Sequence, residues 1–250
     1  WEHRSNSSFV VFLRLTLYLY SPSCTCLLSP LSIDAPPHWR LYRRLLRCCF
    51  PPNRVKFLPS LCHYLTSSIS IFMKVTLIRH TKVNVPKGTC YGWSDVPVAD
   101  SFCEEAAITK ANLSKKPPFD AVFSSPLTRA RKLASYCGYD NPTLDDRLKE
   151  MNMGDWEMRL YDDIAKEDPH ILAWYEDYMH LEATGGESFP MLFKRVSSFL
   201  DWLKQQPFEH VGIFAHGGVL ICAGIYGGLF PKENAFENLT AFGGIEEIEL

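Results

Sequence analysis

From Met73 to the C-terminus, short apolar runs alternate with longer stretches of helical periodicity. Short apolar runs that are bounded by polar residues are typical of buried strands. Their alternation with helices indicates a mostly parallel sheet covered by helices on both faces, a three-layer α/β/α arrangement. The expected strands are 74–78, 121–125, 210–216 and 244–250, and the expected helices are 101–113, 126–137, 171–179, 188–206 and 217–229.

Two of these helices carry starting signals. Ser101 precedes the first, with Glu104 three residues later, which is the spacing of a capping box. Ser125 and Pro126 precede the second, where serine suits the N-cap and proline the first helical position. The clearest helix, 188–206, has one apolar face made of Leu192, Val196, Phe199 and Leu203. Its charged residues fall elsewhere: Lys194, Arg195, Asp201 and Lys204.

The first 72 residues differ in composition from the rest. They hold eight basic and two acidic residues, so they carry a net charge of +6, and the remainder carries −8 in a chain whose total is −2. They contain no methionine, and Met73 directly precedes the first convincing strand. We interpret residues 1–72 as an extension outside any domain, either disordered or upstream sequence translated in frame. A targeting segment is the alternative, because the extension is rich in Arg and Ser and poor in acids.

Two minor interpretations of this extension remain open. Its paired cysteines could bind a metal, although no His/Cys partner set at zinc spacing follows them. The segment 39–50 could form a basic amphipathic helix on a membrane surface. The apolar stretch 9–20 contains Arg14 and is too short to span a bilayer.

Charge and cysteine content bear on partners and compartment. A net charge of −2 gives no reason to expect nucleic acid, and we expect no membrane association. The cysteines after Met73 are scattered without a C-x-x-C pair, which indicates reduced thiols in a cytoplasmic protein. They are Cys90, Cys103, Cys137 and Cys222. The sequence leaves the oligomeric state open.

Polar residues gather where the expected strands end. Ligands of open α/β sheets bind outside the carboxyl ends of the strands, so residues far apart in sequence can share one pocket there. These residues are Arg79 and His80, Ser124 and Ser125, and His216, with Arg129 in the first turn of a following helix.

Two arginines, two histidines and helix N-terminal amides favour an anion. A phosphoryl group fits better than a carboxylate, because it offers three oxygens rather than two. An imidazole beside it can attack phosphorus and carry the phosphoryl group covalently. Departure of the leaving group then needs an acid, for which Glu150 is the candidate.

These residues lie in five motifs whose order resembles the histidine phosphatase superfamily, which includes the cofactor-dependent phosphoglycerate mutases. The motifs are "LIRHT" (77–81), "SSPLTRA" (124–130), "LKEMNMGDWE" (148–157), "GGES" (185–188) and "FAHGG" (214–218). The resemblance begins at Met73 and implies that residues 73–250 form a catalytic domain with a phosphoglycerate mutase-like fold.

The resemblance also implies roles for individual residues. His80 matches the phosphorylated nucleophile, whose other ring nitrogen should donate to an acceptor. Glu150 matches the group that protonates the leaving alcohol and later deprotonates water. No metal and no cofactor is expected. The residues implied to hold the phosphate are Arg79, Arg129, His216 and Gly217, with Asn84 as a further candidate.

This sequence departs from the family pattern in two places. The family often has R-H-G-E-T/S followed by an asparagine, whereas Thr81, Lys82 and Val83 stand here. Asn84 is therefore not at the usual offset for a phosphate contact. The family's W-E-G ending is replaced by a sequence that ends in Met158.

The substrate is predicted to be a small phosphomonoester. The chain from Glu150 to His216 is too short for the inserted segment of a phosphoglycerate mutase, which favours a hydrolase. The stretch 90–98, with 148–157, resembles bacterial α-ribazole phosphatases, which remove the 5′-phosphate from the nucleotide-loop precursor of cobalamin. A broad sugar or nucleotide phosphatase and a mutase-like enzyme of the same superfamily are the alternatives.

Other classes of function have less support. A serine hydrolase needs a G-x-S-x-G elbow, which is absent from the sequence. The glycines after His216 do not have G-x-G-x-x-G spacing. A phosphate-binding regulatory protein without turnover stays possible, but the set of two Arg, two His and one Glu is intact. Trp93 and Trp156 could line the pocket or simply pack, and we expect no catalytic role for His3, His38, His63, His170, His180 and His210.

Overall fold

The four predicted strands and one further short strand form a five-stranded sheet in the computed structural model, which describes residues 72–250. The strand order is β3-β2-β4-β1-β5, and only β5 runs antiparallel to its neighbour. The mostly parallel sheet predicted from the sequence is therefore confirmed. Our interpretations of the preceding residues lie outside the described part. The strands are β1 (Lys74–Arg79), β2 (Ala121–Ser124), β3 (Thr143–Leu144), β4 (His210–Ala215) and β5 (Ile245–Glu249).

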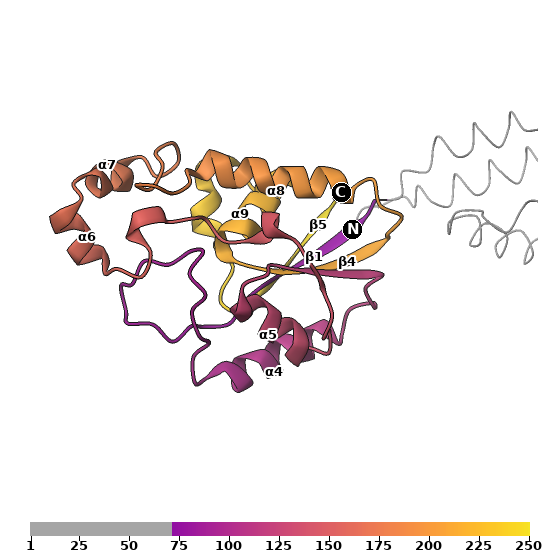
Figure 1. The fold of residues 1–250 in the computed structure, drawn as a ribbon. Helices are drawn as coiled ribbons and strands as arrows, with labels where there is room; N and C mark the ends of the chain where they lie inside the picture. Colours follow the sequence, from indigo (N-terminus) through magenta and orange to yellow (C-terminus); the bar gives the residue numbers. More distant parts are fainter. Residues whose placement is uncertain (1–71) are drawn as a thin grey trace, which may run out of the picture. The chain divides into compact units, whose positions relative to one another are not determined.

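Helices cover both faces of the sheet. In Figure 1, α4 and α5 lie on one side of the strands, α8 and α9 lie on the other, and α6 and α7 lie beyond one end. The three-layer α/β/α arrangement is therefore confirmed. The helices are α4 (Phe102–Leu113), α5 (Thr128–Tyr136), α6 (Tyr161–Glu167), α7 (His170–Glu176), α8 (Phe189–Leu203) and α9 (Gly217–Tyr226). Short 3-10 turns are η1 (Asp146–Leu148), η2 (Gly154–Trp156) and η3 (Lys232–Asn238).

Apolar side chains fill the space on both sides of the sheet. Successive side chains of a strand point to opposite faces. Leu77 and Ile213 accordingly pack with α8 and α9, whereas Ile78, Leu133 and Phe214 pack in the core beneath α4 and α5. All four residues of the predicted apolar face of α8 are buried. Burial of this apolar surface is what drives the layers together.

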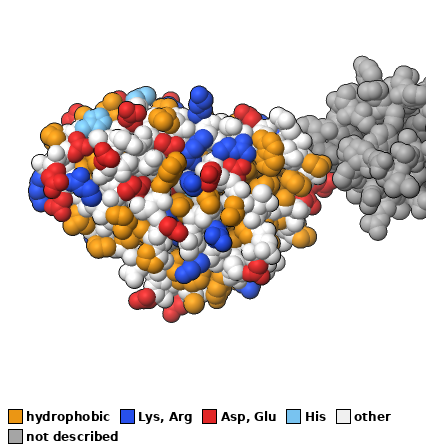
Figure 2. All heavy atoms as spheres, in the orientation of Figure 1, with side chains coloured by type: hydrophobic (Ala, Val, Ile, Leu, Met, Phe, Trp, Pro, Cys, Tyr) orange, Lys and Arg blue, Asp and Glu red, His pale blue; other side chains and the backbone are white. Residues whose placement is uncertain are grey.

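The surface seen in Figure 2 has a mixed character. Basic and acidic side chains are interspersed over that face, with apolar side chains between them. Mixed charge of this kind is usual for a globular protein and does not concentrate potential of one sign. Among residues 72–250, no helix is both long enough and apolar enough to cross a membrane.

The start of α5 differs from the prediction. The helix begins at Thr128, and Leu127 occupies the N-cap in an extended conformation, so Ser125 and Pro126 lie before the helix. The Ser125 hydroxyl is instead 2.7 Å from Nε2 of His216. Asp95, from a distant loop, accepts hydrogen bonds from the Thr128 amide at 2.8 Å and from its hydroxyl at 2.5 Å. The cap is thus supplied by tertiary contact.

The capping box predicted at the start of α4 is also wrong, although its N-cap residue is correct. Ser101 is the N-cap, but its hydroxyl makes no capping hydrogen bond and donates to Glu105 at 2.9 Å. Glu105, rather than Glu104, is the acid engaged there, and it also accepts the backbone N–H of Lys82 at 2.9 Å. That second bond ties α4 to the loop after β1.

Three further elements depart from the sequence reading. The predicted helix 171–179 ends at Glu176, because Asp177 leaves helical geometry at φ −141° and ψ 51°. The short helix α6 and the two-residue strand β3 were not predicted. Both are too short for a clear apolar period.

Candidate active site

The strand register brings the two site histidines together. Arg79 at the end of β1 pairs with Ala215 at the end of β4, so His80 and His216 both follow directly at the same edge. Their ring centroids are 5.1 Å apart, and their exposed fractions are 2% and 0%. The edge is the carboxyl end of the parallel strands, where α/β folds bind ligands.

His80 is held in one tautomer by the backbone. Its Nδ1 lies 2.6 Å from the carbonyl oxygen of Thr81, which can only accept, so Nδ1 carries the proton. The acceptor expected from the sequence is therefore present, and Nε2 keeps its lone pair. Burial, and then the Arg129 guanidinium, lower the pKa of His80 to about 3. A neutral imidazole with a free Nε2 is the nucleophilic form.

Arg129 is anchored to the loop that follows β1. Its NH1 donates to the carbonyl of Ser94 at 2.8 Å and its NH2 to that of Gly92 at 2.6 Å. The side chain is fully buried, and within residues 72–250 its Nε has no hydrogen-bond partner. Its guanidinium also lies 5.5 Å from the Tyr91 ring. A buried cation with a free donor is suited to an anionic ligand.

Arg79 is oriented by the segment between α9 and β5. Its NH1 donates to the carbonyl of Thr240 at 2.5 Å, and its guanidinium carbon lies 4.1 Å above the Phe242 ring. Phe242 also contacts His80, with ring centroids 5.5 Å apart. Sequence reasoning missed Phe242, since a single phenylalanine in a loop carries no signal of its own.

Glu150 reaches the same edge from the irregular segment after η1. Its Oε2 accepts the N–H of Gly218 at 3.2 Å, in the first turn of α9, and its Oε1 accepts that of Met151 at 3.0 Å. Its charge raises the pKa of Arg79 and of Arg129, although burial has the larger, lowering effect on both. A Cβ on Gly218 would lie 2.4 Å from Oε1, so any larger residue there would displace the carboxyl group.

His216 is the most enclosed member of the group. Burial is the main cause that lowers its pKa well below the ordinary value, and the charge of Arg129 adds to this. Its Nε2 is bonded to Ser125, whereas Nδ1 is buried and has no partner in the described part of the chain. Gly217 follows at the start of α9, where a Cβ would lie 3.2 Å from the Arg79 guanidinium carbon. The glycine therefore lets the arginine approach.

Asn84 is a predicted site residue that no hydrogen bond in the described part of the chain links to this group. It is exposed, and its backbone N–H donates to the carbonyl of Pro97 at 2.8 Å. Within residues 72–250 its side chain makes no hydrogen bond to the histidines, the arginines or Glu150. Its role as a phosphate contact stays a prediction.

The two tryptophans separate into different environments. Trp156 is fully buried, and its Nε1 donates to Asp168 at 2.7 Å, which is a packing role. Trp93 is 40% exposed, with the Lys149 ammonium 5.0 Å from its ring. It neighbours the two carbonyls that hold Arg129, so it lies at the border of the site.

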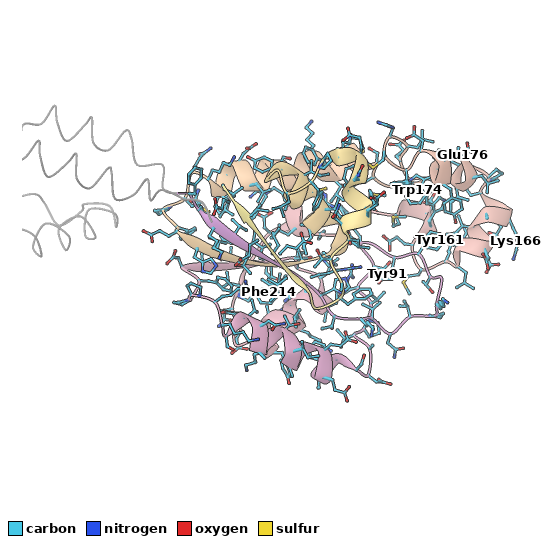
Figure 3. All side chains as sticks on the ribbon, turned by 180° about the vertical axis from the view of Figure 1, so that it is seen from behind. Tyr91, Tyr161, Lys166, Trp174, Glu176 and Phe214 are labelled. Atoms are coloured by element: carbon cyan, nitrogen blue, oxygen red, sulfur yellow. The ribbon has the colours of Figure 1, made fainter. Side chains whose placement is uncertain are left out.

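The site is bordered by the segment that carries α6 and α7. In Figure 3, Tyr91 lies between Phe214 in the sheet and Tyr161 and Trp174 on that segment. Burial raises the pKa of Tyr91, and Arg129 and Arg79 oppose that effect. Tyr91 is thus a second aromatic neighbour that sequence reasoning missed. Within residues 72–250, no group of three or more His, Cys, Asp or Glu could hold a metal ion.

Glu157 is a further residue that sequence reasoning did not single out. Its carboxylate accepts the N–H groups of Gly92, Trp93, Ser94 and Met153 at 2.7 to 3.1 Å. Burial acts to raise the pKa of Glu157, and these donors hold it below the ordinary value. Glu157 therefore fixes the loop whose carbonyls anchor Arg129.

We expect Glu157→Gln to lower the free energy of unfolding by about 3 kcal/mol, because an amide group would face backbone donors in place of a carboxylate. It should also raise KM, since the loop whose carbonyls anchor Arg129 would be held less firmly. Urea unfolding and steady-state kinetics check this. Glu167→Gln, at an exposed pair with Arg159, is the control and should stay within about 0.5 kcal/mol. A Glu157→Gln protein as stable as the wild type would contradict the role.

Acid should destabilise the fold through the buried histidines. In the unfolded chain a histidine binds a proton near its ordinary pKa, whereas folded His80 stays neutral down to about 3. The unfolded state therefore binds more protons as the pH falls below the ordinary value. We expect His80 alone to cost about 2 kcal/mol of unfolding free energy between about pH 7 and about pH 5. His80→Asn should show a shallower fall in urea unfolding, and an equal fall in both proteins would exclude this contribution.

A neutral, buried histidine pair with two arginines and one glutamate at the carboxyl edge of a parallel sheet defines a class of phosphate-handling protein. The family model of the histidine phosphatase superfamily (branch 1) matches residues 75–232, and the chain belongs to this superfamily. The fold and the family expected from the motifs are thereby confirmed.

The proteins similar to this chain include several phosphatases. The chain is 35% identical over 155 residues to the adenosylcobalamin/alpha-ribazole phosphatase of Salmonella typhimurium. The matched region covers 59% of this chain and 76% of the relative. It is 27% identical to a glucosyl-3-phosphoglycerate phosphatase of Mycolicibacterium vanbaalenii, over 59% of this chain and 70% of that protein. The crystal structure of the alpha-ribazole phosphatase from Shigella flexneri superposes with a TM-score of 0.64 at 29% identity, covering 70% of this chain and 89% of that one.

Proposed function

We propose that this protein hydrolyses a phosphomonoester through a phosphohistidine intermediate at His80, and that residues 73–250 form the catalytic domain. The observation that carries the proposal is the state of His80. Its Nδ1 proton is committed to the Thr81 carbonyl, and its free Nε2 belongs to a ring buried beside two arginines. Such a group can attack phosphorus without first losing a proton.

The reaction would proceed in two displacements. In the first, Nε2 of His80 forms a bond to phosphorus, the bond from phosphorus to the ester oxygen breaks, and Glu150 in its acid form gives that oxygen a proton. In the second, Glu150 takes a proton from water, the water oxygen attacks phosphorus, and the bond from phosphorus to Nε2 breaks. One alcohol and one inorganic phosphate leave, and the enzyme returns to its starting state.

The remaining polar groups would stabilise charge on the transferring group. Arg79 and Arg129 are already oriented by carbonyl oxygens, so they need little rearrangement when phosphate binds. His216 and the Gly217 amide complete the contacts. We infer no step that uses a metal or a cofactor.

For the substrate we propose α-ribazole 5′-phosphate. This rests on the relatives named above and on the segments 90–98 and 148–157. The two segments are neighbours in the fold, because the N–H groups of Gly92, Trp93 and Ser94 donate to the Glu157 carboxylate at 2.7 to 3.1 Å.

The test compares kcat/KM for α-ribazole 5′-phosphate with sugar phosphates, nucleoside monophosphates and phosphoglycerates, using protein that starts at Met73 and the full chain. A clear preference for α-ribazole 5′-phosphate supports the assignment to cobalamin assembly. Equal or higher activity across the panel, lost in His80→Ala, keeps the mechanism and points to a broad phosphatase. A folded protein that binds phosphate without turnover would be a regulatory binding protein instead.

A further inference from the structure

Glu187 and Arg195 form an ion pair beside the site. Glu187 belongs to the "GGES" stretch, and Arg195 stands on α8 outside its apolar face. Their contact is bidentate: Nε of Arg195 lies 2.8 Å from Oε1 and NH2 lies 2.9 Å from Oε2. Both side chains are largely buried, with an exposed fraction of 17% for Arg195 and 12% for Glu187. Arg195 is thus largely enclosed by the protein, although the helical pattern placed it outside the apolar face of α8.

The remaining donors of Arg195 bind the backbone that leads to Glu150. NH1 donates to the carbonyls of Arg147 at 2.8 Å and Lys149 at 2.6 Å, and NH2 donates to that of Glu150 at 2.7 Å. One guanidinium therefore holds three carbonyl acceptors within four residues of chain. A planar fork of donors is suited to this, and an ammonium group is not.

Glu187 holds the same stretch from its other end. Its Oε2 accepts the N–H of Asn152 at 2.8 Å, and its own N–H donates to the Asn152 carbonyl at 2.8 Å. Residues 149–153 belong to no helix or strand. Their position therefore depends on side-chain contacts rather than on a regular hydrogen-bond ladder.

We propose that Glu187 and Arg195 are positioning residues that set the Glu150 carboxyl group for proton transfer. The inference rests on the proposed hydrolysis. The backbone carbonyl of Glu150 accepts a hydrogen bond from Arg195, and its carboxyl group accepts one from the Gly218 N–H. Loss of the first contact would let the carboxyl group shift relative to the ester oxygen. A displacement of about 1 Å can cost about 100-fold in rate.

The test separates proton transfer from general loss of structure. Phenyl phosphate and p-nitrophenyl phosphate have similar shapes, but p-nitrophenolate departs without a proton, whereas phenolate benefits from one. First-turnover rates in rapid-mixing experiments report phosphoryl transfer alone. We expect Arg195→Lys and Glu187→Gln to slow the first turnover of phenyl phosphate by between about tenfold and about 100-fold, and that of p-nitrophenyl phosphate by less than about threefold.

Two comparisons complete the design. Arg147→Lys is the matched control, because Arg147 pairs with Asp145 at 2.6 Å and its side chain does not hold Glu150. Arg147→Lys should not slow the first turnover of one substrate more than that of the other. In an Arg195→Lys, Glu150→Gln double variant, phenyl phosphate should turn over no more slowly than in Glu150→Gln alone, because the positioned group is already gone.

The outcomes are distinct. Equal losses on the two substrates, or no loss in either positioning variant while thermal unfolding shows a folded protein, would overturn the inference. If Arg195→Lys does not fold, Glu187→Gln decides the same question. Absence of first turnover in the wild type on both aryl phosphates and on α-ribazole 5′-phosphate removes the proposed function itself, and that failure is recognised without any variant.

Discussion

Replacing His80 by alanine is expected to abolish turnover, with a loss of about 10⁴-fold or more, because no other group can accept the phosphoryl. His216 is the neighbouring imidazole, but its Nε2 is already bonded to the Ser125 hydroxyl. The measurement is kcat/KM on the best substrate of the panel. Rapid denaturation of turning-over enzyme with radiolabelled substrate should also trap acid-labile label on the wild type and none on His80→Ala.

His180→Ala is the control for this experiment. His180 is exposed, and its Nδ1 lies 2.6 Å from Oδ1 of Asp177. It should trap label and turn over like the wild type. Turnover of His80→Ala at the wild-type rate would exclude the covalent route, and direct attack by water would then have to replace it.

Replacing Glu150 by glutamine is expected to slow the reaction by between about 10² and about 10⁴, the usual contribution of a positioned general acid. Glutamine is close in size to glutamate, and its carbonyl can still accept one of the two N–H groups that the carboxylate accepts. It cannot supply the proton. Steady-state kinetics on phenyl and p-nitrophenyl phosphate measure the loss, which should be larger for phenyl phosphate.

Asp155→Asn is the comparison for Glu150→Gln. Asp155 is exposed and is the acidic residue nearest in sequence to Glu150 within the motif 148–157. Its backbone N–H donates to the carbonyl of Thr184 at 2.8 Å. We expect it to keep wild-type rates. An unchanged rate in Glu150→Gln together with a loss in Asp155→Asn would assign the acid role to Asp155.

The strands and the main helices could be predicted because their signals are local. A mostly apolar run such as that of β4, or the repeat that buries Leu192 and Val196 on α8, can be seen in neighbouring residues. The strand ends then follow, since parallel strands share one carboxyl edge. His80 and His216 could therefore be expected near each other before any coordinates were considered.

Contacts between segments that are distant in sequence could not be predicted from local patterns. Asp95 caps α5 across 33 residues, and Arg195 reaches back 45 residues to the Glu150 carbonyl. No local pattern encodes these long-range contacts. Serine is a good N-cap residue type, but the Ser125 hydroxyl is bonded to His216 instead. Helix periodicity likewise marked Arg195 as outside the apolar face, but could not say that a buried glutamate meets it there.

The sequence by itself determined the order of the main strands and helices and the family, and it predicted which histidines, arginines and glutamate gather at the site. Local periodicity and motif spacing carry that information. Only the tertiary structure decided which ring nitrogen of His80 holds the proton, which carbonyls orient Arg129, and which pair fixes Glu150. The reason is physical: a side chain's protonation and direction depend on the burial and hydrogen-bond partners that surround it, and those partners come from other parts of the chain.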